Sequence, residues 1–370
     1  MRGRARFGRE AGLETRITRL LGIEHPVVQA GMAGGPTTPR LVAAVSEAGG
    51  LGTLGAAYMT PAAIRSAVEG IRALTRKPFA VNLFVPEPFD PSLYDPQEIG
   101  ASLARYREEL GVEAPGELSY VQSFEDQLAV VLEERVPVFS FTFGVPEGPH
   151  LDALREAGIV TAGTATTVRE ALAVEAAGVD AVTAQGAEAG GHRGTFLGPY
   201  EGGLVGTMAL VPQVADAVEI PVLAAGGIMD GRGLAAALAL GADGAQMGTA
   251  FLACPESGAQ EGYKRVLLSA TEEETTVTRA FSGKAARGLK NRFTEEMEGA
   301  EVAAYPVQNA HTRDIRAAAA KADRTEFMSL WSGQAPRLAR PVPAAEVVER
   351  TVAVASKLVS NRNPERGSGA

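Results

Sequence analysis

The sequence has few residues of the kinds that mark extracellular or metal-binding proteins. Its 370 residues include one cysteine, Cys254, which cannot form a disulfide within the chain, so a reducing compartment is the expected setting. The four histidines show no metal-ligand spacing, and we predict no metal site. No apolar run reaches the ~18 residues that a membrane helix needs, and we therefore expect a cytoplasmic protein without membrane contact.

Positive charge is also scarce. The chain has 35 Lys and Arg residues against 44 Asp and Glu, which gives a formal net charge of −9. Nucleic acids attract proteins through a positive field, so we expect no nucleic-acid partner, and any anionic ligand must be held by local groups. With 45% hydrophobic and 21% charged residues, the composition is that of a globular chain able to bury a large core.

Short apolar runs alternate with alanine-rich helical segments over most of the chain. Thr38-Pro39 and Thr60-Pro61 each combine a helix N-cap with a first-turn proline, and Gly49 closes the first of these helices. Buried strands separated by helices imply parallel pairing, and eight such units close into a TIM (β/α)8 barrel. The predicted strands are Val27–Ala30, Leu51–Leu54, Phe79–Val85, Val136–Phe143, Ile159–Gly163, Ala181–Gln185, Pro221–Ala225 and Gly244–Gly248.

The spacing of this pattern breaks after the third strand and again after the eighth. The stretch from Val85 to Val136 is too long for one crossover, and its prolines and helical segments indicate an insertion at about 86–135 on the catalytic rim. We therefore expect a disordered N-terminal segment at 1–15, the barrel at 16–255, and a helical and loop-rich extension at 256–370 that packs on the barrel mouth.

Glycine-rich turns follow the last two predicted strands. Gly226-Gly227 comes after the seventh strand, and Gln246–Thr249 ends the eighth. In this fold, backbone amides at these two loops, beside a helix start, form a frequent phosphate-binding site. Each motif alone could be a tight turn, but the pair predicts a phosphate-bearing ligand.

Two amide side chains lie at the ends of other strands. Asn82 lies in the third strand and Gln185 closes the sixth, around an apolar floor expected from Met32, Leu83 and Met247. Such a site suits a flat flavin ring better than a sugar, although an Asn near a strand end is often only a turn former.

A GxGxxG pattern at Gly50–Gly55 does not indicate a dinucleotide site. A Rossmann fingerprint follows a strand and begins a helix, whereas these glycines follow a predicted helix and run through a strand. We reject a Rossmann site for this reason.

The loop after the sixth strand reads GAEAGGHRG from Gly186 to Gly194. Its glycines allow the backbone to approach a ligand closely and place His192 at the barrel mouth. An imidazole there can accept a proton from carbon or, when protonated, hold an anion. Glu188 and Arg193 are either a pair that stabilises the loop or ligand contacts, and we favour the pair.

The chain resembles the FMN-dependent nitronate monooxygenases, formerly called 2-nitropropane dioxygenases. The likeness extends from about Ile17 to Ala335, and its most specific pieces are EAGGHRG and QMGTAFL. Further matching blocks are QAGMAGGPTTPRLVAAVSEAGGLGTLG, TRAFSGKAARGLKNRF, YPVQN and LWSGQ.

The resemblance implies an FMN cofactor and a catalytic role for His192. It assigns a set of residues to the cofactor: Met32, Ala33, Asn82, Gln185, Gly190, Gly191, Gly226, Gly227, Gln246, Met247, Gly248 and Thr249. Tyr106, Tyr263 and Tyr305 resemble the family's pocket aromatics, although each could instead be packing.

The implied activity is the oxidation of alkyl nitronates by O2 to a carbonyl compound and nitrite, with neutral nitroalkanes left open as substrates. One residue departs from the usual Pro-Met-Ala-Gly-Gly pattern, because the chain has Gly31 in place of the proline. This leaves an NAD(P)H-dependent FMN reductase of enoyl thioesters or quinones as the alternative. A flavin-binding module without turnover is a third, less favoured interpretation, and the sequence leaves the oligomeric state open.

Overall fold

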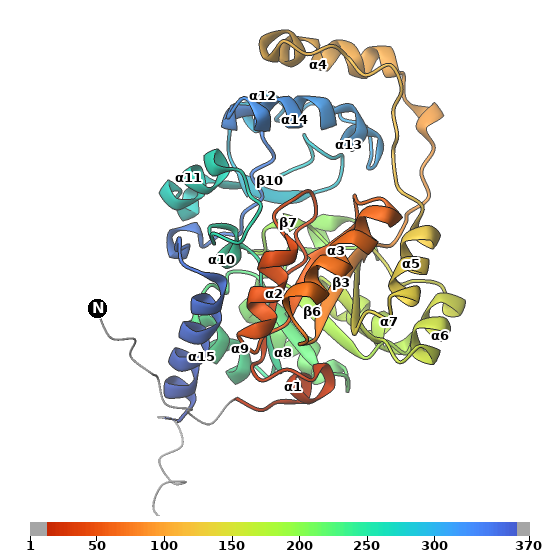
Figure 1. Ribbon diagram of the computed structural model, residues 1–370. Coiled ribbons are helices and arrows are strands. Elements are labelled where there is room, and N and C mark those ends of the chain that lie inside the picture. The colour runs from red at the N-terminus through yellow and green to blue at the C-terminus, as the bar shows by residue number, and fades with distance from the viewer. Residues whose placement is uncertain (1–12, 361–370) are drawn as a thin grey trace, which may run out of the picture.

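The computed structural model describes residues 13–360, so most of the N-terminal segment expected at 1–15 lies outside the described residues. Eight parallel strands form one sheet in the order β1-β9-β8-β6-β5-β4-β3-β2, and a parallel bridge from Val28 to Leu51 joins its two edges. This closed sheet confirms the predicted TIM barrel (Figure 1). Its strands are β1 (Val27–Gln29), β2 (Gly52–Gly55), β3 (Phe79–Phe84), β4 (Val138–Thr142), β5 (Val160–Ala165), β6 (Ala181–Gln185), β8 (Val222–Ala225) and β9 (Gly244–Met247).

Helices surround the barrel and begin where their caps predict. The side chains of Thr38 and Thr60 accept hydrogen bonds from the third residue of α2 and α3, and a proline follows each threonine. The outer helices are α2 (Pro39–Glu47), α3 (Pro61–Leu74), α5 (Phe124–Glu133), α6 (Gly148–Glu156), α7 (Val168–Ala176), α8 (Thr207–Ala217) and α9 (Gly231–Ala239).

The short helix α1 (Arg16–Leu21) closes one end of the barrel. Its buried residues Ile17 and Leu21 pack with inward-facing residues of the strands, among them Val28, Ala80 and Leu223. Because this end is sealed, a ligand can reach the barrel only from the opposite end, where the strands terminate.

The last helix, α15 (Ala344–Ser360), completes the outer layer. It packs between α9 and α2, and Gly231 of α9 approaches it so closely that a Cβ would lie 2.3 Å from the carbonyl oxygen of Thr351. The chain between the short α10 (Thr249–Leu252) and α15 is therefore an excursion that leaves the barrel and returns to it.

This excursion covers the open end of the barrel (Figure 1). A small antiparallel sheet, in the order β10-β11-β7, joins it to the loop after β6. Its elements are α11 (Glu261–Ser269), η3 (Glu272–Glu274), β10 (Thr275–Thr278), β11 (Ala286–Leu289), α12 (Arg292–Glu296), α13 (Val307–His311), α14 (Arg313–Lys321), η4 (Thr325–Phe327) and η5 (Pro336–Leu338), while β7 (Gly191–His192) and η2 (Tyr200–Gly203) belong to the segment between β6 and α8.

The segment after β3 contains two different kinds of helix. Its second helix, α5, packs against α3 and β3 as part of the barrel's outer layer. Its first, α4 (Pro96–Leu110), follows η1 (Pro91–Leu93) and packs instead on α14, where the buried Arg107 donates to Asp314 at 2.7 Å. The segment from Pro86 to about Gln122 is thereby attached to the extension above the barrel.

Candidate functional site

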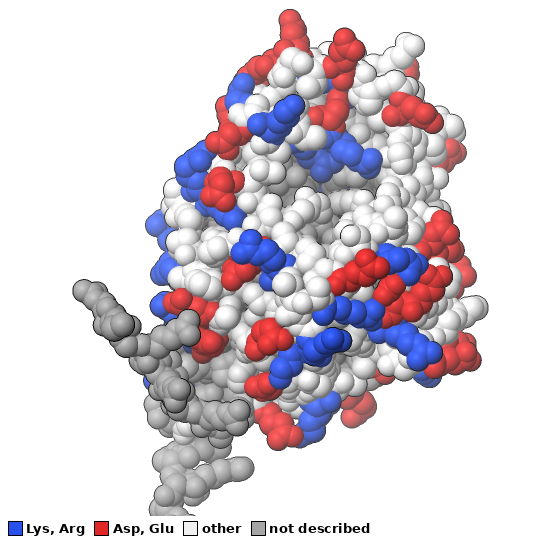
Figure 2. Space-filling view, in the orientation of Figure 1, with Lys and Arg blue, Asp and Glu red and all other residues white. Residues whose placement is uncertain are grey.

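A cavity of ≈ 620 Å³ lies between the strand ends of the barrel and the covering extension. Figure 2 shows the surface hollowed below the extension, with Lys and Arg side chains on the upper edge of the hollow. Residues from the ends of β1, β3, β6, β8 and β9 line it, together with residues of α14 and the loop after β3. This is the end of a TIM barrel at which ligands bind.

The glycine turns after β8 and β9 both line this cavity. Gly226 and Gly227 have φ angles of 121° and 69°, a backbone conformation that favours glycine. Within residues 13–360, no group accepts a hydrogen bond from the backbone amides of Gly227, Gly248 and Thr249. Three amides without protein partners at a cavity wall are the donors that a phosphate group requires.

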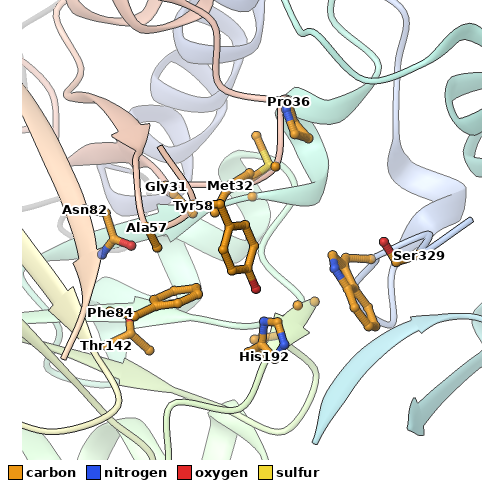
Figure 3. A pocket seen from close by; sticks show the side chains of 18 of the residues that line it. Gly31, Met32, Pro36, Ala57, Tyr58, Asn82, Phe84, Thr142, His192 and Ser329 are labelled. Carbon is orange, nitrogen blue, oxygen red and sulfur yellow. The ribbon is translucent and has the colours of Figure 1, made fainter. Parts of the chain in front are cut away.

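Asn82 lines the opposite side of the cavity, where Figure 3 shows it near Gly31 and Ala57. Its Nδ2 donates to Ser140 Oγ at 3.0 Å, and its side chain is held by close packing as well. A Cβ on Gly31 would lie only 2.7 Å from the Cβ of Asn82. With Asn82 in this position, residue 31 has no room for a side chain. This explains why a glycine stands where the pattern of the resemblance has a proline.

Gln185 also reaches the cavity, but its amide is committed to the loop that carries His192. Its Nε2 donates to the carbonyl oxygen of His192 at 3.0 Å, and its Oε1 accepts from the amide of Gly194 at 2.8 Å. Gln185 therefore holds the backbone on both sides of the histidine, a role that its position at a strand end did not reveal.

His192 lies in β7, opposite Ala286 of β11. Its Nε2 is 2.8 Å from the hydroxyl oxygen of Ser282. Burial lowers the pKa of His192 to about 3, and the positive charges of Lys284 and Arg316 contribute to the shift. The imidazole is therefore neutral at physiological pH.

Aromatic rings surround this histidine. The ring centroids of Phe84, Phe143, Tyr305 and Trp331 lie 5.9, 5.7, 6.1 and 5.5 Å from that of His192. Tyr58 points toward His192 across the cavity in Figure 3. The sequence alone does not mark Tyr58, Phe84, Phe143 or Trp331 as site residues, because they come from segments that only the folded chain brings together.

The cavity carries positive charge although the whole chain is acidic. Arg313 and Arg316 of α14 line it, and Arg313 forms no ion pair with any described residue. The acidic residue among those that line it is Glu87, and both of its carboxylate oxygens accept from Lys284 Nζ at 2.7 Å. The unbalanced charge of the two arginines favours an anionic ligand.

Glu188 and Arg193 stabilise the histidine loop separately rather than as a pair. Arg193 is 1% exposed and donates to the carbonyl oxygens of Gly186, Gln185 and Gly203 at 2.7, 2.8 and 3.0 Å. The Glu188 carboxylate accepts from the backbone amide and the hydroxyl of Thr207 at the start of α8. Burial lowers the pKa of Arg193 to about 10, which leaves it charged at neutral pH.

Most of the residues expected at the cofactor lie around the cavity. Those that line it are Met32, Ala33, Asn82, Gln185, Gly190, Gly191, Gly226, Gly227, Gln246, Gly248 and Thr249, and the predicted catalytic residue His192 lines it as well. Met247, by contrast, is 1% exposed and packs in the layer between the strands and the outer helices. Successive strand residues point to opposite faces, so Gln246 points inward and Met247 outward.

Two of the three tyrosines expected in the pocket line the cavity, and the third lies elsewhere. Tyr305 and Tyr263 line the cavity, and the Tyr263 hydroxyl donates to the carbonyl oxygen of Trp331. Tyr106 does not line it, because its ring is buried on α4 between Phe293 and Phe327, with centroids 4.7 and 5.7 Å away. Tyr106 therefore joins α4 to the extension.

The sequence also led to expectations about metal sites, membrane helices and Cys254. Within residues 13–360, no group of three or more His, Cys, Asp or Glu side chains is arranged to hold a metal ion. No helix in the same range is long and apolar enough to span a membrane. Cys254 is buried, and burial raises the pKa of its thiol to about 12, so it is an inert core residue.

Comparison with known proteins identifies the family. The nitronate monooxygenase family model matches residues 14–353. The chain belongs to the nitronate monooxygenase family. It is 47% identical over 343 residues to a probable nitronate monooxygenase of Staphylococcus aureus strain MSSA476, a match that covers 92% of this chain and 96% of the relative.

Solved structures agree with this assignment. A nitroalkane oxidase from Streptomyces ansochromogenes matches with a TM-score of 0.87 and 44% identity, covering 94% of this chain and 99% of that one. FabK from Thermotoga maritima matches with a TM-score of 0.74 and 35% identity, covering 95% of this chain and 98% of that one. The chain is thus an oxidoreductase of the nitronate monooxygenase type, and its family implies a flavin cofactor and the oxidation of nitronates or nitroalkanes.

Proposed function

We propose that the protein binds FMN and oxidises alkyl nitronates with O2, giving a carbonyl compound and nitrite. The observation that carries this proposal is the juxtaposition, in one cavity, of a neutral histidine and the unpartnered amides of two glycine turns. A chain of this family with such a cavity has a place both for a flavin phosphate and for a small substrate.

The residues around the cavity fit FMN. The amides of Gly227, Gly248 and Thr249 would hold its phosphate, and Asn82 would meet the ring, with Met32 and Ala33 against its face. FMN, when bound, supplies an electron acceptor that takes an electron from the substrate and passes it to O2. The protein contributes binding, orientation and the exclusion of water.

The charge of the cavity favours the anionic nitronate. Arg316 is partly buried, and burial lowers its pKa, so it gains from an anion placed beside it. The aromatic shell around His192 excludes water and strengthens this attraction. A nitronate has already lost its proton and needs no base.

A neutral nitroalkane must first lose a proton to a base, and His192 is the base that we propose. Its low pKa makes it a weak base at first. As the proton leaves carbon, however, negative charge develops on the nitro group, and that charge stabilises the imidazolium ion. We therefore expect nitronates to react faster than nitroalkanes, with His192 required for nitroalkanes alone.

The second candidate is an NAD(P)H-dependent flavin reductase of enoyl thioesters or quinones. The match to FabK and the glycine at position 31 favour it. A flavin-binding module without turnover is disfavoured, because storage alone does not require a histidine held open to the cavity.

The test uses the purified protein with its bound cofactor. The flavin is released and identified as FMN or FAD, and oxygen uptake and nitrite are measured with ethyl nitronate and with nitroethane. We expect FMN, rapid uptake with the nitronate and slower uptake with the nitroalkane. Anaerobic bleaching by NAD(P)H together with no nitronate oxidation would replace this proposal with the reductase.

A further inference from the structure

We infer that Ser282 is a positioning residue that fixes the tautomer of His192, so that Nε2 carries the hydrogen and Nδ1 is the basic nitrogen. The kinetic part of this inference rests on the proposed function. The tautomer itself follows from hydrogen-bond geometry and can be tested without any substrate.

The serine hydroxyl has three polar neighbours but only one hydrogen to donate. One neighbour, the backbone amide of Lys284, donates to Ser282 Oγ at 3.3 Å and does not compete for that hydrogen. Ser282 Oγ lies 2.8 Å from His192 Nε2 and 3.0 Å from the carbonyl oxygen of Lys284. A carbonyl oxygen only accepts hydrogen bonds, so the serine hydrogen points to Lys284. Nε2 must then donate to Ser282 Oγ, and it therefore carries the imidazole hydrogen.

The opposite tautomer would leave a polar group without its donor. If Nε2 were unprotonated, Ser282 would donate to it, and the Lys284 carbonyl oxygen would lose this hydrogen bond. Within residues 13–360, no other group donates to that oxygen. Ser282 is 1% exposed, so little water reaches the side of that oxygen on which the serine hydroxyl lies.

The other nitrogen faces the cavity. Nδ1 has no hydrogen-bond partner among residues 13–360, and it is not buried. It is therefore open to the cavity that His192 lines. The lone pair on Nδ1 is therefore the one available to a substrate.

The turn that holds Ser282 is itself fixed on both sides. Gly283 has a φ of 81°, and a Cβ there would lie 2.2 Å from the carbonyl oxygen of Ala303. Three residues later the chain pairs with His192 itself, through Ala286 of β11, and the Arg193 amide donates to Ala285 at 2.8 Å. The register of this small sheet thus places Ser282 beside the imidazole before any ligand binds.

This arrangement defines the proton transfer with a nitroalkane. The Nδ1 lone pair takes the proton from the carbon that bears the nitro group. The C–H electron pair becomes the C=N bond of the nitronate, an N=O electron pair moves onto oxygen, and the imidazole becomes a cation. A mixture of tautomers would place a hydrogen on Nδ1 in part of the population and remove the base there.

The decisive test is nitrogen NMR of the holoenzyme labelled with 15N-histidine. His192 is assigned by the resonance lost in His192→Asn. We expect a protonated nitrogen at Nε2 and an unprotonated one at Nδ1 in the wild type, and averaged shifts in Ser282→Ala. A hydrogen on Nδ1 in the wild type, or a tautomer unchanged in Ser282→Ala, would overturn the inference.

Kinetics separate this positioning role from a general loss of structure. In Ser282→Ala, loss of one orienting hydrogen bond should lower kcat for nitroethane by roughly 5- to 10-fold and change that for ethyl nitronate by less than about 2-fold. Ser282→Thr keeps the hydroxyl and should restore the nitroethane rate, while Ser269→Ala, at an exposed position of α11, serves as the remote control. Equal losses with both substrates would contradict the role.

The two proposals can fail separately. If the wild type oxidises neither substrate, the proposed function is refuted, while the NMR experiment still decides the tautomer.

Discussion

Replacing Arg193 by methionine tests how the histidine loop is held in place. Methionine keeps only the apolar first part of the side chain and donates no hydrogen bond, so the carbonyl oxygens of Gln185 and Gly203 would lose their donor, while that of Gly186 keeps the amide of Ala189. Each unsatisfied buried carbonyl costs about 1–3 kcal/mol. The variant no longer buries a charge, which offsets part of this loss, and we expect a net destabilisation of about 3 kcal/mol.

This energy converts to a measurable shift in melting temperature. With an unfolding entropy of about 2.1 cal/mol/K per residue, a loss of 3 kcal/mol in a chain of 370 residues lowers the melting temperature by about 4 °C. Differential scanning fluorimetry of the holoenzyme at neutral pH measures it. The nitroethane rate should fall as well, because the same loop carries His192.

The matched control is Arg232→Met. Arg232 is an exposed arginine whose ion pair with Asp230 is also exposed, so its loss should change the stability by less than about 0.5 kcal/mol. If Arg193→Met lowers the melting temperature by less than 1 °C, or by no more than Arg232→Met, the described role of Arg193 is refuted.

Three further predictions follow from the cavity. Gly31→Ala should displace Asn82 and weaken FMN binding by about tenfold, because overpacking of this kind costs about 1–3 kcal/mol. Titration of the apoprotein with FMN measures the change in affinity. His192 binds protons more readily in the unfolded chain than in the folded protein, so the free energy of unfolding should fall as the pH falls from 6.5 toward 3. In His192→Asn the melting temperature should fall less over the same pH range, as melting curves recorded in acid would show. Lys284→Met removes a positive charge beside His192, so it should raise the pKa of that imidazole, seen as an upward shift in its NMR titration. No shift would exclude Lys284 as a cause.

The barrel could be predicted from the sequence because its signals are local. The caps at Thr38 and Thr60 begin α2 and α3 as expected, and the buried apolar runs became strands within one or two residues. The glycine turns after β8 and β9 also lie at the cavity, since the end of a parallel strand fixes where the next loop begins. The outward direction of Met247 could have been predicted from strand alternation alone.

The surroundings of His192 could not be predicted in the same way. Ser282 is 90 positions away in the sequence and meets the imidazole only through the register of β7 and β11. Trp331 and Arg316 come from the excursion between α10 and α15, whose packing leaves no periodic pattern in the sequence. Tyr106 was expected in the pocket from the family resemblance, with packing as the alternative, and nothing local in the sequence shows which surface α4 covers.

The central claim is that His192 acts as a neutral base that only the nitroalkane requires. The most direct measurement compares wild type and His192→Asn, both loaded with FMN, in oxygen uptake with nitroethane and with ethyl nitronate. A missing general base should lower the nitroethane rate by about 100-fold or more and leave the nitronate rate within a few fold. Full nitroethane turnover by His192→Asn, or an equal loss with both substrates, would contradict the account.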